Sequence, residues 1–197
     1  MDKIKRFLKS LNIDESQKQV FSITGKMASG KNYICSQFEK YGWKSIDADK
    51  LVHKAIELSK EQIYSAFKDE AEKQNINILN DDNSINRREL GRLLFSNPNL
   101  LAKQESIVYP LVIEMTENFI KENDKVLINA TVLYKTPVLM QKCSRIIFVR
   151  SSFLKRFIRT KKRDHLPAKQ ILSRFNSQKD LYKNYKTTNI PISIIKN

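Results

Sequence analysis

A short stretch near the N-terminus has the residue spacing of a loop that binds nucleotide phosphates. Residues 25–32 read GKMASGKN and match the pattern G-x-x-x-x-G-K, in which Gly30 lets the backbone approach the phosphates and Lys31 bridges two of them. Successive backbone N–H groups and the positive end of the following helix bind the same anion. The motif directly follows the first apolar strand, which favours a nucleotide site over an ordinary strand-to-helix turn.

Two carboxylates, Asp47 and Asp49, follow the second predicted strand. Open α/β sheets bind ligands at the carboxyl ends of their strands. Two residues apart on an extended segment, both side chains would point the same way. One carboxylate would then take the proton from an attacking hydroxyl while the other holds Mg²⁺. A helix cap is the alternative for Asp49, because aspartate often precedes a helix.

Asn32 and a row of arginines complete the set of candidate residues. Asn32 stands where the loop motif has a Ser or Thr hydroxyl that binds Mg²⁺, and it offers a carboxamide oxygen instead. Arg156, Arg159 and Arg163 have the spacing of one helical face, which we expect to be too polar to pack in a core. This face is either solvated or closes over the transferring phosphate as a lid. The phosphate loop favours the lid.

Five apolar segments would position these residues, at 20–23, 43–46, 126–130, 145–149 and 190–195. Helical patterns lie between them at 32–41, from 50 to about 121 with an interruption at 77–84, at 136–142 and at 152–185. Strands that alternate with helices indicate a doubly wound, parallel, five-stranded α/β sheet. An amphipathic segment at 3–11 is expected to pack on the domain surface, with a membrane-surface or partner-binding helix as the alternative.

The composition is that of a globular protein with an anionic ligand. The 197 residues include 36 Lys plus Arg against 21 Asp plus Glu, a net charge of +15, and the excess is concentrated between Lys142 and Lys186. This charge implies nucleotides, phosphorylated metabolites, nucleic acid or lipid headgroups, without choosing among them. No apolar run approaches the roughly 20 residues of a membrane span. Cys35 and Cys143 lack disulfide or zinc spacing and are expected to be buried.

Taken in order, these motifs resemble the dephospho-CoA kinase family over nearly all of residues 20–197. The resemblance rests on Thr24-Gly25 with Ser29-Gly30-Lys31, Asp47-Ala48-Asp49, Arg87-Arg88-Glu89-Leu90, Phe95-Ser96-Asn97-Pro98, Ile107-Val108-Tyr109-Pro110, Arg163-Asp164 and Arg174-Phe175-Asn176-Ser177-Gln178. It implies a P-loop kinase fold and ATP-dependent phosphorylation of the 3′-hydroxyl of dephospho-CoA, the last step of coenzyme A synthesis. We expect an N-terminal helical extension over 1–18 and a kinase domain over 19–197, with an acceptor-binding helical excursion over 50–122 and a lid over 150–178.

The resemblance also implies a role for each site residue. Asp49 is similar to the family's general base, and Lys31 and Arg163 complete the catalytic set. ATP would be bound by Lys31, Arg159 and Asn197 together with Ala28, Ser29, Gly30, Asn32 and Tyr33. The acceptor would contact Asp47, Arg87, Arg88 and Tyr109, and Mg²⁺ would be held by Asn32 and Asp47. The expected partners are ATP and dephospho-CoA, without nucleic acid or membrane, for a cytoplasmic monomer or weak oligomer.

Several positions depart from the family pattern and leave alternatives open. Lys26 and Ala28 stand where the family usually has Gly, Asn32 replaces Ser or Thr, and Tyr109 replaces a His before a proline. The sequence stops at Asn197, in a segment that resembles the family's stretch near the adenine. A nucleotide-binding protein without catalysis, or another small-metabolite or nucleoside kinase, would fit these changes. A nucleic-acid-binding module could use the basic second half, but this alternative leaves the loop unexplained.

Overall fold

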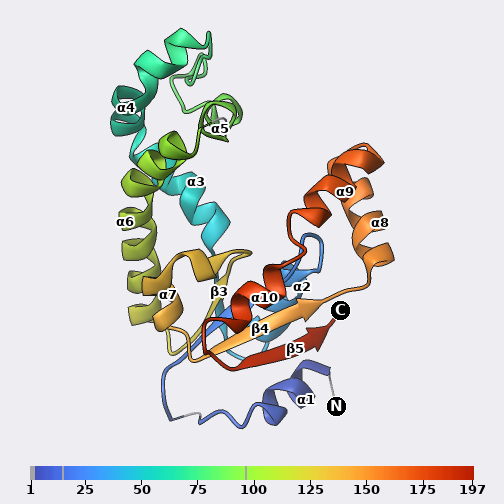
Figure 1. Ribbon diagram of the computed structural model, residues 1–197. Helices are drawn as coiled ribbons and strands as arrows, with labels where there is room; N and C mark the ends of the chain where they lie inside the picture. Colours follow the sequence, from blue (N-terminus) through green and yellow to red (C-terminus); the bar gives the residue numbers. More distant parts are fainter. Residues whose placement is uncertain (1–2, 15, 96) are drawn as a thin grey trace. The chain divides into compact units, whose positions relative to one another are not determined.

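The computed structural model describes residues 3–14, 16–95 and 97–197 (Figure 1). They form two compact units: a sheet unit, whose described residues lie within Met1–Asp47 and Asn118–Asn197, and a helical unit, whose described residues lie within Ala48–Glu117. Residues 1, 2 and 15 of the predicted extension and Ser96 of the quoted motifs lie outside the described residues. No helix in the described part of the chain is long and apolar enough to cross a membrane.

The sheet unit is built on five parallel strands. They are β1 (Gln19–Thr24), β2 (Lys44–Asp47), β3 (Lys125–Asn129), β4 (Arg145–Arg150) and β5 (Ile192–Lys196), in the order β2-β3-β1-β4-β5. The three inner strands are buried along nearly their whole length, because helices cover both faces of a parallel sheet. The predicted doubly wound α/β fold is confirmed, and the carboxyl ends of all five strands meet at one edge.

The helices α1 (Lys3–Ser10) and α2 (Lys31–Glu39) pack on one face of this sheet. Ile4 of α1 and Phe38 of α2 belong to the same buried cluster as Phe21 of β1. The rings of Phe7 and Phe38 meet edge to face with centroids 6.2 Å apart. The N-terminal segment therefore packs against the domain, as predicted, and Cys35 is buried in the same cluster.

The opposite face is covered by α10 (Leu181–Lys186). The chain from β3 to β4 forms two short helices, η1 (Leu133–Lys135) and α7 (Pro137–Gln141). The ring of Tyr182 meets that of Phe148 at 4.9 Å. Phe148 alternates along β4 with Ile147 and Val149, which face the first cluster, so it must point the other way. Cys143 is buried, as expected.

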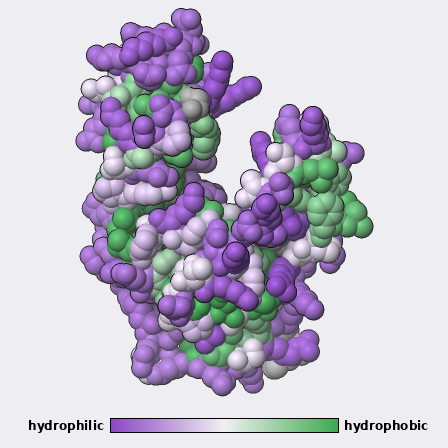
Figure 2. Space-filling view, viewed as in Figure 1, coloured by the Kyte–Doolittle hydropathy of each residue, from purple (hydrophilic) through white to green (hydrophobic). Residues whose placement is uncertain are grey.

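The predicted helical pattern over 152–185 is confirmed and comprises three helices. They are α8 (Phe153–Asp164), α9 (Ala168–Asn176) and α10. The first break occurs because His165 takes a left-handed φ of 52° as the C-cap of α8, and Pro167 then precedes α9. A proline lacks a backbone N–H and disfavours helix in the residue before it. Figure 2 shows hydrophobic side chains gathered on the surface of α8 and α9, where Phe153, Leu154, Ile158 and Leu172 are exposed.

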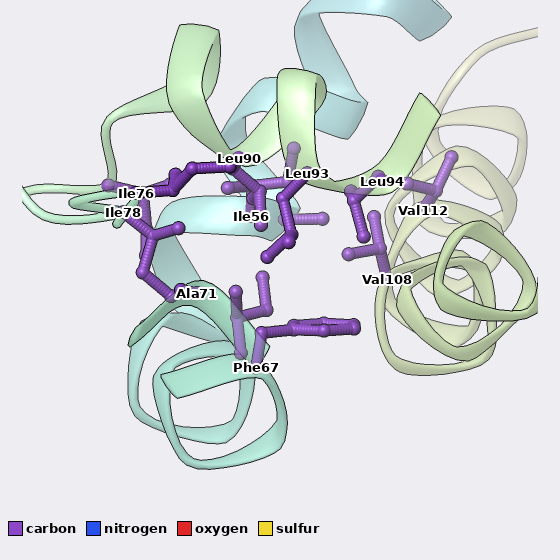
Figure 3. Packing of buried hydrophobic residues seen from close by; sticks show 13 residues of the cluster. Ile56, Phe67, Ala71, Ile76, Ile78, Leu90, Leu93, Leu94, Val108 and Val112 are labelled. Carbon is purple, nitrogen blue, oxygen red and sulfur yellow. The ribbon is translucent and has the colours of Figure 1, made fainter. Parts of the chain in front are cut away.

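The helical unit has a hydrophobic core of its own. Its helices are α3 (Ala48–Leu58), α4 (Lys60–Lys73), α5 (Arg87–Phe95) and most of α6 (Pro98–Glu122). Figure 3 shows Phe67 of α4 and Leu93 of α5 in the same core as Val108 of α6. The predicted interruption at 77–84 is confirmed, because α4 ends at Lys73 and α5 begins at Arg87. The segment between them contains a short antiparallel bridge between Leu79 and Ile85.

Candidate active site

The residues from Gly25 to Gly30 form a tight loop between β1 and α2. Two of them are left-handed, Ala28 at φ 58° and Gly30 at φ 92°. A β-carbon on Gly30 would overlap the side-chain nitrogen of Asn197, and one on Gly25 would lie 2.6 Å from the carbonyl oxygen of Val149. The backbone of Val149 thus requires glycine at position 25, whereas at position 30 the positive φ favours glycine and the Asn197 side chain would have to shift to admit a larger residue. Ala28 holds its conformation at a cost of about 1 kcal/mol, at a position where glycine would hold it without strain.

Lys31 is the first residue of α2, which places its side chain beside the loop. Its ammonium donates hydrogen bonds to the hydroxyl of Thr131, at 3.0 Å, and to the carbonyl of Gly25, at 3.3 Å. These contacts hold a positive charge next to the N–H groups of a helix N-terminus, where phosphate binds. Thr131 was not predicted as a site residue. The available signal was a polar residue just beyond the carboxyl end of a buried strand.

Oxygen donors meet at the same edge of the sheet. Asn32 in the first turn of α2 accepts a hydrogen bond from the side-chain nitrogen of Asn129 at 2.8 Å. Asn129 ends β3 and is the register partner of Asp47, which ends β2. Among the described residues, no group of three or more His, Cys, Asp or Glu could hold a metal. A site with one carboxylate and one amide oxygen fits Mg²⁺, which keeps several waters and binds substrate phosphates.

Asp49 lies in the first turn of α3 and not on the strand. The strand β2 ends at Asp47, and the helix begins at Ala48. The prediction that Asp47 and Asp49 share an extended segment is therefore wrong, and the pleat no longer gives them a common direction. A carboxylate in a first turn stabilises the positive end of the helix. Asp47 belongs to the sheet unit and Asp49 to the helical unit.

Arg156 corrects the prediction that the arginine row cannot enter a core. Its side chain is buried, with 7% of the residue exposed, and the guanidinium lies 4.1 Å from the ring centroid of Phe175. Its Nε donates to the carbonyl oxygen of Met27 at 2.8 Å, while the N–H of Met27 donates to the Gln178 side chain at 2.6 Å. The cation is tolerated because a carbonyl and an aromatic face replace water. Residues of α8 and of the turn after α9 thus hold both backbone groups of Met27.

The other two arginines of the row behave differently. Arg159 is exposed and donates to the carbonyl oxygens of Ala28, at 3.3 Å, and Ser29, at 3.4 Å. The structure therefore brings Arg159 to the loop. Arg163 forms two hydrogen bonds with the neighbouring Asp164, at 2.6 and 2.9 Å, which hold the pKa of that carboxyl below its usual value.

A cavity of about 660 Å³ opens beside the phosphate loop, lined in part by Ser29, Phe148 and Tyr182. The Ser29 hydroxyl is buried and has no hydrogen-bond partner among the described residues. None of the described residues that line the cavity is acidic, and six are cationic: Lys3, Lys26, Arg150, Lys155, Arg156 and Lys196. A basic cavity with an aromatic wall beside a phosphate loop suits a nucleotide.

The C-terminal segment forms another wall of this cavity. The backbone N–H of Asn197 donates to the carbonyl of Arg150 at 2.8 Å, and its side chain donates to the carbonyl of Ser29 at 2.9 Å. The predicted residue Asn197 therefore lies at the loop. Lys3, which precedes the predicted kinase domain, donates to the carbonyl of Lys196 and lines the same cavity. Sequence reasoning gave Lys3 no role.

The remaining predicted residues lie elsewhere. Tyr33 is exposed in the first turn of α2. Arg87 and Arg88 are exposed in the first turn of α5, within the helical unit. Tyr109 of α6 is half-buried and bonded to Glu105 at 3.1 Å, and burial, with the nearby Glu105 carboxylate, raises its pKa to about 12. Arg87, Arg88 and Tyr109 all belong to the helical unit, and their contact with an acceptor stays a prediction.

Comparison with known proteins decides the family. A model of the dephospho-CoA kinase family matches residues 19–197. Dephospho-CoA kinase of Treponema denticola is 34% identical over 188 residues, covering 92% of this chain and 83% of that protein. The chain belongs to the dephospho-CoA kinase family. The dephospho-CoA kinase of Treponema pallidum is 28% identical over 168 residues, covering 83% of this chain and 79% of that protein.

Solved structures share the fold. TT1252 from Thermus thermophilus has a TM-score of 0.76 at 22% identity, covering 92% of this chain and 89% of that one. Dephospho-CoA kinase from Campylobacter jejuni has a TM-score of 0.58 at 24% identity, covering 91% of this chain and 88% of that one. Membership of the dephospho-CoA kinase family confirms the predicted class: an ATP-using phosphotransferase that acts on an alcohol group of dephospho-CoA, in the last step of coenzyme A synthesis.

Proposed function

We propose that this chain transfers the γ-phosphoryl group of ATP to the 3′-hydroxyl of dephospho-CoA at the site around Lys31. The observation that carries this assignment is the position of the Lys31 ammonium, beside the loop backbone at the start of α2 and 3.0 Å from Thr131. A helix N-terminus and a fixed ammonium together bind the β- and γ-phosphates of a nucleotide. The adjoining basic cavity would receive the rest of the ATP molecule.

The chemistry needs a base, and Asp49 is our candidate. The 3′-oxygen of the acceptor attacks the γ-phosphorus, a new O–P bond forms, and the bond to the β,γ-bridging oxygen breaks. The hydroxyl proton passes to the Asp49 carboxylate, and ADP leaves. Lys31 offsets the charge on the phosphoryl oxygens throughout this step.

Asn32 and Asp47 are the residues that would hold Mg²⁺. Both present oxygen atoms at the edge of the sheet, and Asn129 is bonded to one and paired in register with the other. A carboxamide oxygen has two lone pairs, so Asn32 can accept from Asn129 and still bind a metal. When bound together with ATP, Mg²⁺ would offset the negative charge of the phosphates during the transfer.

The basic lid and the helical unit carry the remaining residues of the proposal. We assign Arg159 to ATP because it already contacts the loop carbonyls, and Arg163 to the phosphates once its pairing with Asp164 is exchanged for them. Arg87, Arg88 and Tyr109 are assigned to the acceptor, whose phosphates would be bound by the two arginines. A cytoplasmic location and a monomeric or weakly oligomeric state stay predictions.

The test is the mass of dephospho-CoA after incubation with the purified chain and Mg-ATP. We expect a gain of one phosphoryl group, a loss of at least about 100-fold in rate for Lys31→Ala and for Asp49→Asn, and wild-type turnover for Lys40→Ala. Lys40 is an exposed lysine just beyond the other end of α2 and controls for loss of charge. Wild-type turnover in both site variants would refute the assignment. ATP binding without transfer would indicate a nucleotide-binding protein that lacks the chemistry.

A further inference from the structure

The phenol of Tyr185, in α10, binds the main chain just beyond β3. Tyr185 is fully buried. Its hydroxyl accepts a hydrogen bond from the N–H of Leu133 at 2.9 Å and donates one to the carbonyl of Thr131 at 3.2 Å. One side chain from near the C-terminus thus fixes both ends of the short segment 131–133.

Thr131 connects this segment to the phosphate loop. Its carbonyl also accepts a hydrogen bond from the Thr24 hydroxyl at 3.0 Å, so β1 and α10 hold the same peptide group. Its own hydroxyl accepts from the Lys31 ammonium at 3.0 Å. Thr131 therefore links the two residues: its backbone carbonyl is bonded to Tyr185 and its side-chain hydroxyl to Lys31.

We propose that Thr131 and Tyr185 are positioning residues for Lys31, with Thr131 holding the ammonium and Tyr185 holding Thr131. The inference rests on the proposed function, because it assigns how that site keeps its lysine in place. Neither residue is assigned a contact with the reacting atoms.

The physical need arises from the lysine side chain. Four rotatable bonds give it considerable rotamer entropy, which must be lost before the ammonium can meet a phosphate. A contact that already restricts the ammonium reduces this loss during the reaction. Thr131 can do so only if its own backbone is fixed, and two buried hydrogen bonds to its carbonyl fix it.

The ring of Tyr185 is itself well held. Tyr134 meets it edge to face with centroids 5.2 Å apart, and Asn184 donates to the Tyr134 hydroxyl at 3.1 Å. Burial raises the pKa of Tyr185 to about 12, so the phenol keeps its proton, and its donor role, across the working range of an enzyme. The support for Thr131 is thus independent of pH below about pH 10, where the phenol keeps its proton.

The first experiment compares Thr131→Val with Thr131→Ser. Valine keeps the shape and the backbone carbonyl but removes the hydroxyl, whereas serine keeps the hydroxyl. We expect kcat to fall about tenfold in Thr131→Val, as for loss of a hydrogen bond to a charged group, and to stay within about twofold of wild type in Thr131→Ser. Thr187→Val removes an exposed hydroxyl in the turn after α10 and should leave kcat unchanged. Equal rates in Thr131→Val and wild type would overturn the proposal.

A double-mutant cycle separates positioning from a general structural role. If Thr131 acts through Lys31, adding Thr131→Val to Lys31→Ala should cause no further loss of kcat, measured at raised enzyme concentration. If the two losses multiply, Thr131 supports the fold and not the lysine, and the proposal is wrong.

Tyr185→Phe tests the residue that holds Thr131. We expect kcat to fall about threefold to tenfold, and again with no further loss when Lys31→Ala is present. Tyr64→Phe, an exposed tyrosine of the helical unit, is the matched control. Wild-type kcat in Tyr185→Phe would remove Tyr185 from the proposal. Failure of the proposed function looks different, because the wild-type chain itself would then form no coenzyme A.

Discussion

The side-chain nitrogen of Asn129 donates a hydrogen bond to the carboxamide oxygen of Asn32 across 2.8 Å, joining the end of β3 to the first turn of α2. This contact orients the amide that replaces the usual loop hydroxyl. Asn129 is 5% exposed, so little water competes for the bond. Asn129, the register partner of Asp47, therefore holds the carboxamide oxygen of Asn32 at the edge of the sheet.

Removing the carboxamide oxygen of Asn32 should weaken the binding of Mg²⁺. In Asn32→Ala we expect the Mg²⁺ concentration for half-maximal rate to rise roughly tenfold, because one of few oxygen donors is lost, while the rate at saturating Mg²⁺ falls less. The measurement is a Mg²⁺ titration of coenzyme A formation at fixed ATP. Gln37→Ala, later in the same helix, controls for helix stability. An unchanged Mg²⁺ midpoint would exclude Asn32 as a ligand.

Two glycines offer a matched test of the phosphate loop. Gly30 and Gly42 both have positive φ, at 92° and 82°, but a β-carbon would overlap Asn197 at Gly30 and meets nothing within 4 Å at Gly42. Substitution by alanine should cost each about 1 kcal/mol of unfolding free energy from backbone strain. Only Gly30→Ala should also lose kcat/KM for ATP, by about 100-fold, since it displaces Asn197 and the loop. A similar loss in Gly42→Ala would show that strain alone causes it.

The buried guanidinium of Arg156 should contribute to stability. Arg156→Met loses the hydrogen bond to the Met27 carbonyl and the contact with Phe175, although it also removes a buried nitrogen that has no partner among the described residues. We expect the unfolding free energy to fall by about 2 kcal/mol, measured by urea denaturation. Lys161→Met, an exposed position of the same helix, should change it by less than about 0.5 kcal/mol. Equal changes in unfolding free energy at the two positions would contradict a stabilising role for Arg156.

Tyr185 should make stability depend on pH in the alkaline range. Burial raises its pKa in the folded chain to about 12, above the ordinary value of 10.0. Between these values the folded state binds more protons than the unfolded state, so its stability falls as pH rises. The difference in unfolding free energy between wild type and Tyr185→Phe should therefore be constant below about pH 9 and shrink from about pH 10 upward. A difference that stays constant to pH 11 would contradict this prediction.

Local sequence rules predicted the fold well. The inner strands are mostly apolar because both faces of the sheet are covered, so β1, β3 and β4 were recognisable from composition alone. The phosphate loop was recognisable because a tight turn, a close backbone approach and a helix N-terminus each demand residue types at set spacings. The helical pattern over 152–185 is confirmed, but its division into α8, α9 and α10 was not predicted, since a pattern of apolar residues does not reveal that His165 adopts a left-handed conformation.

Individual site residues were harder to predict. Lys31, Arg159 and Asn197 lie at the loop, as expected from the resemblance. The extended pairing of Asp47 with Asp49 failed because the helix α3 begins at Ala48, two residues earlier than predicted, so Asp49 is already helical. Arg156 was expected outside the core, because its spacing cannot show that Phe175 and the Met27 carbonyl replace the lost water.

By itself, the sequence determined the parallel α/β sheet and the phosphate loop, since these depend on patterns within single segments. It indicated the enzyme class through the order of several motifs over residues 20–197. Only the tertiary structure decided the partners of the loop. Thr131 is 100 residues from Lys31, and Gln178 is 151 residues from Met27. Such contacts form because parallel strands bring their carboxyl ends to one edge, whatever the distance along the chain. Tyr185 shows the limit most clearly, because nothing in its neighbouring residues indicates that its hydroxyl binds the segment that carries Thr131, the hydrogen-bond partner of Lys31.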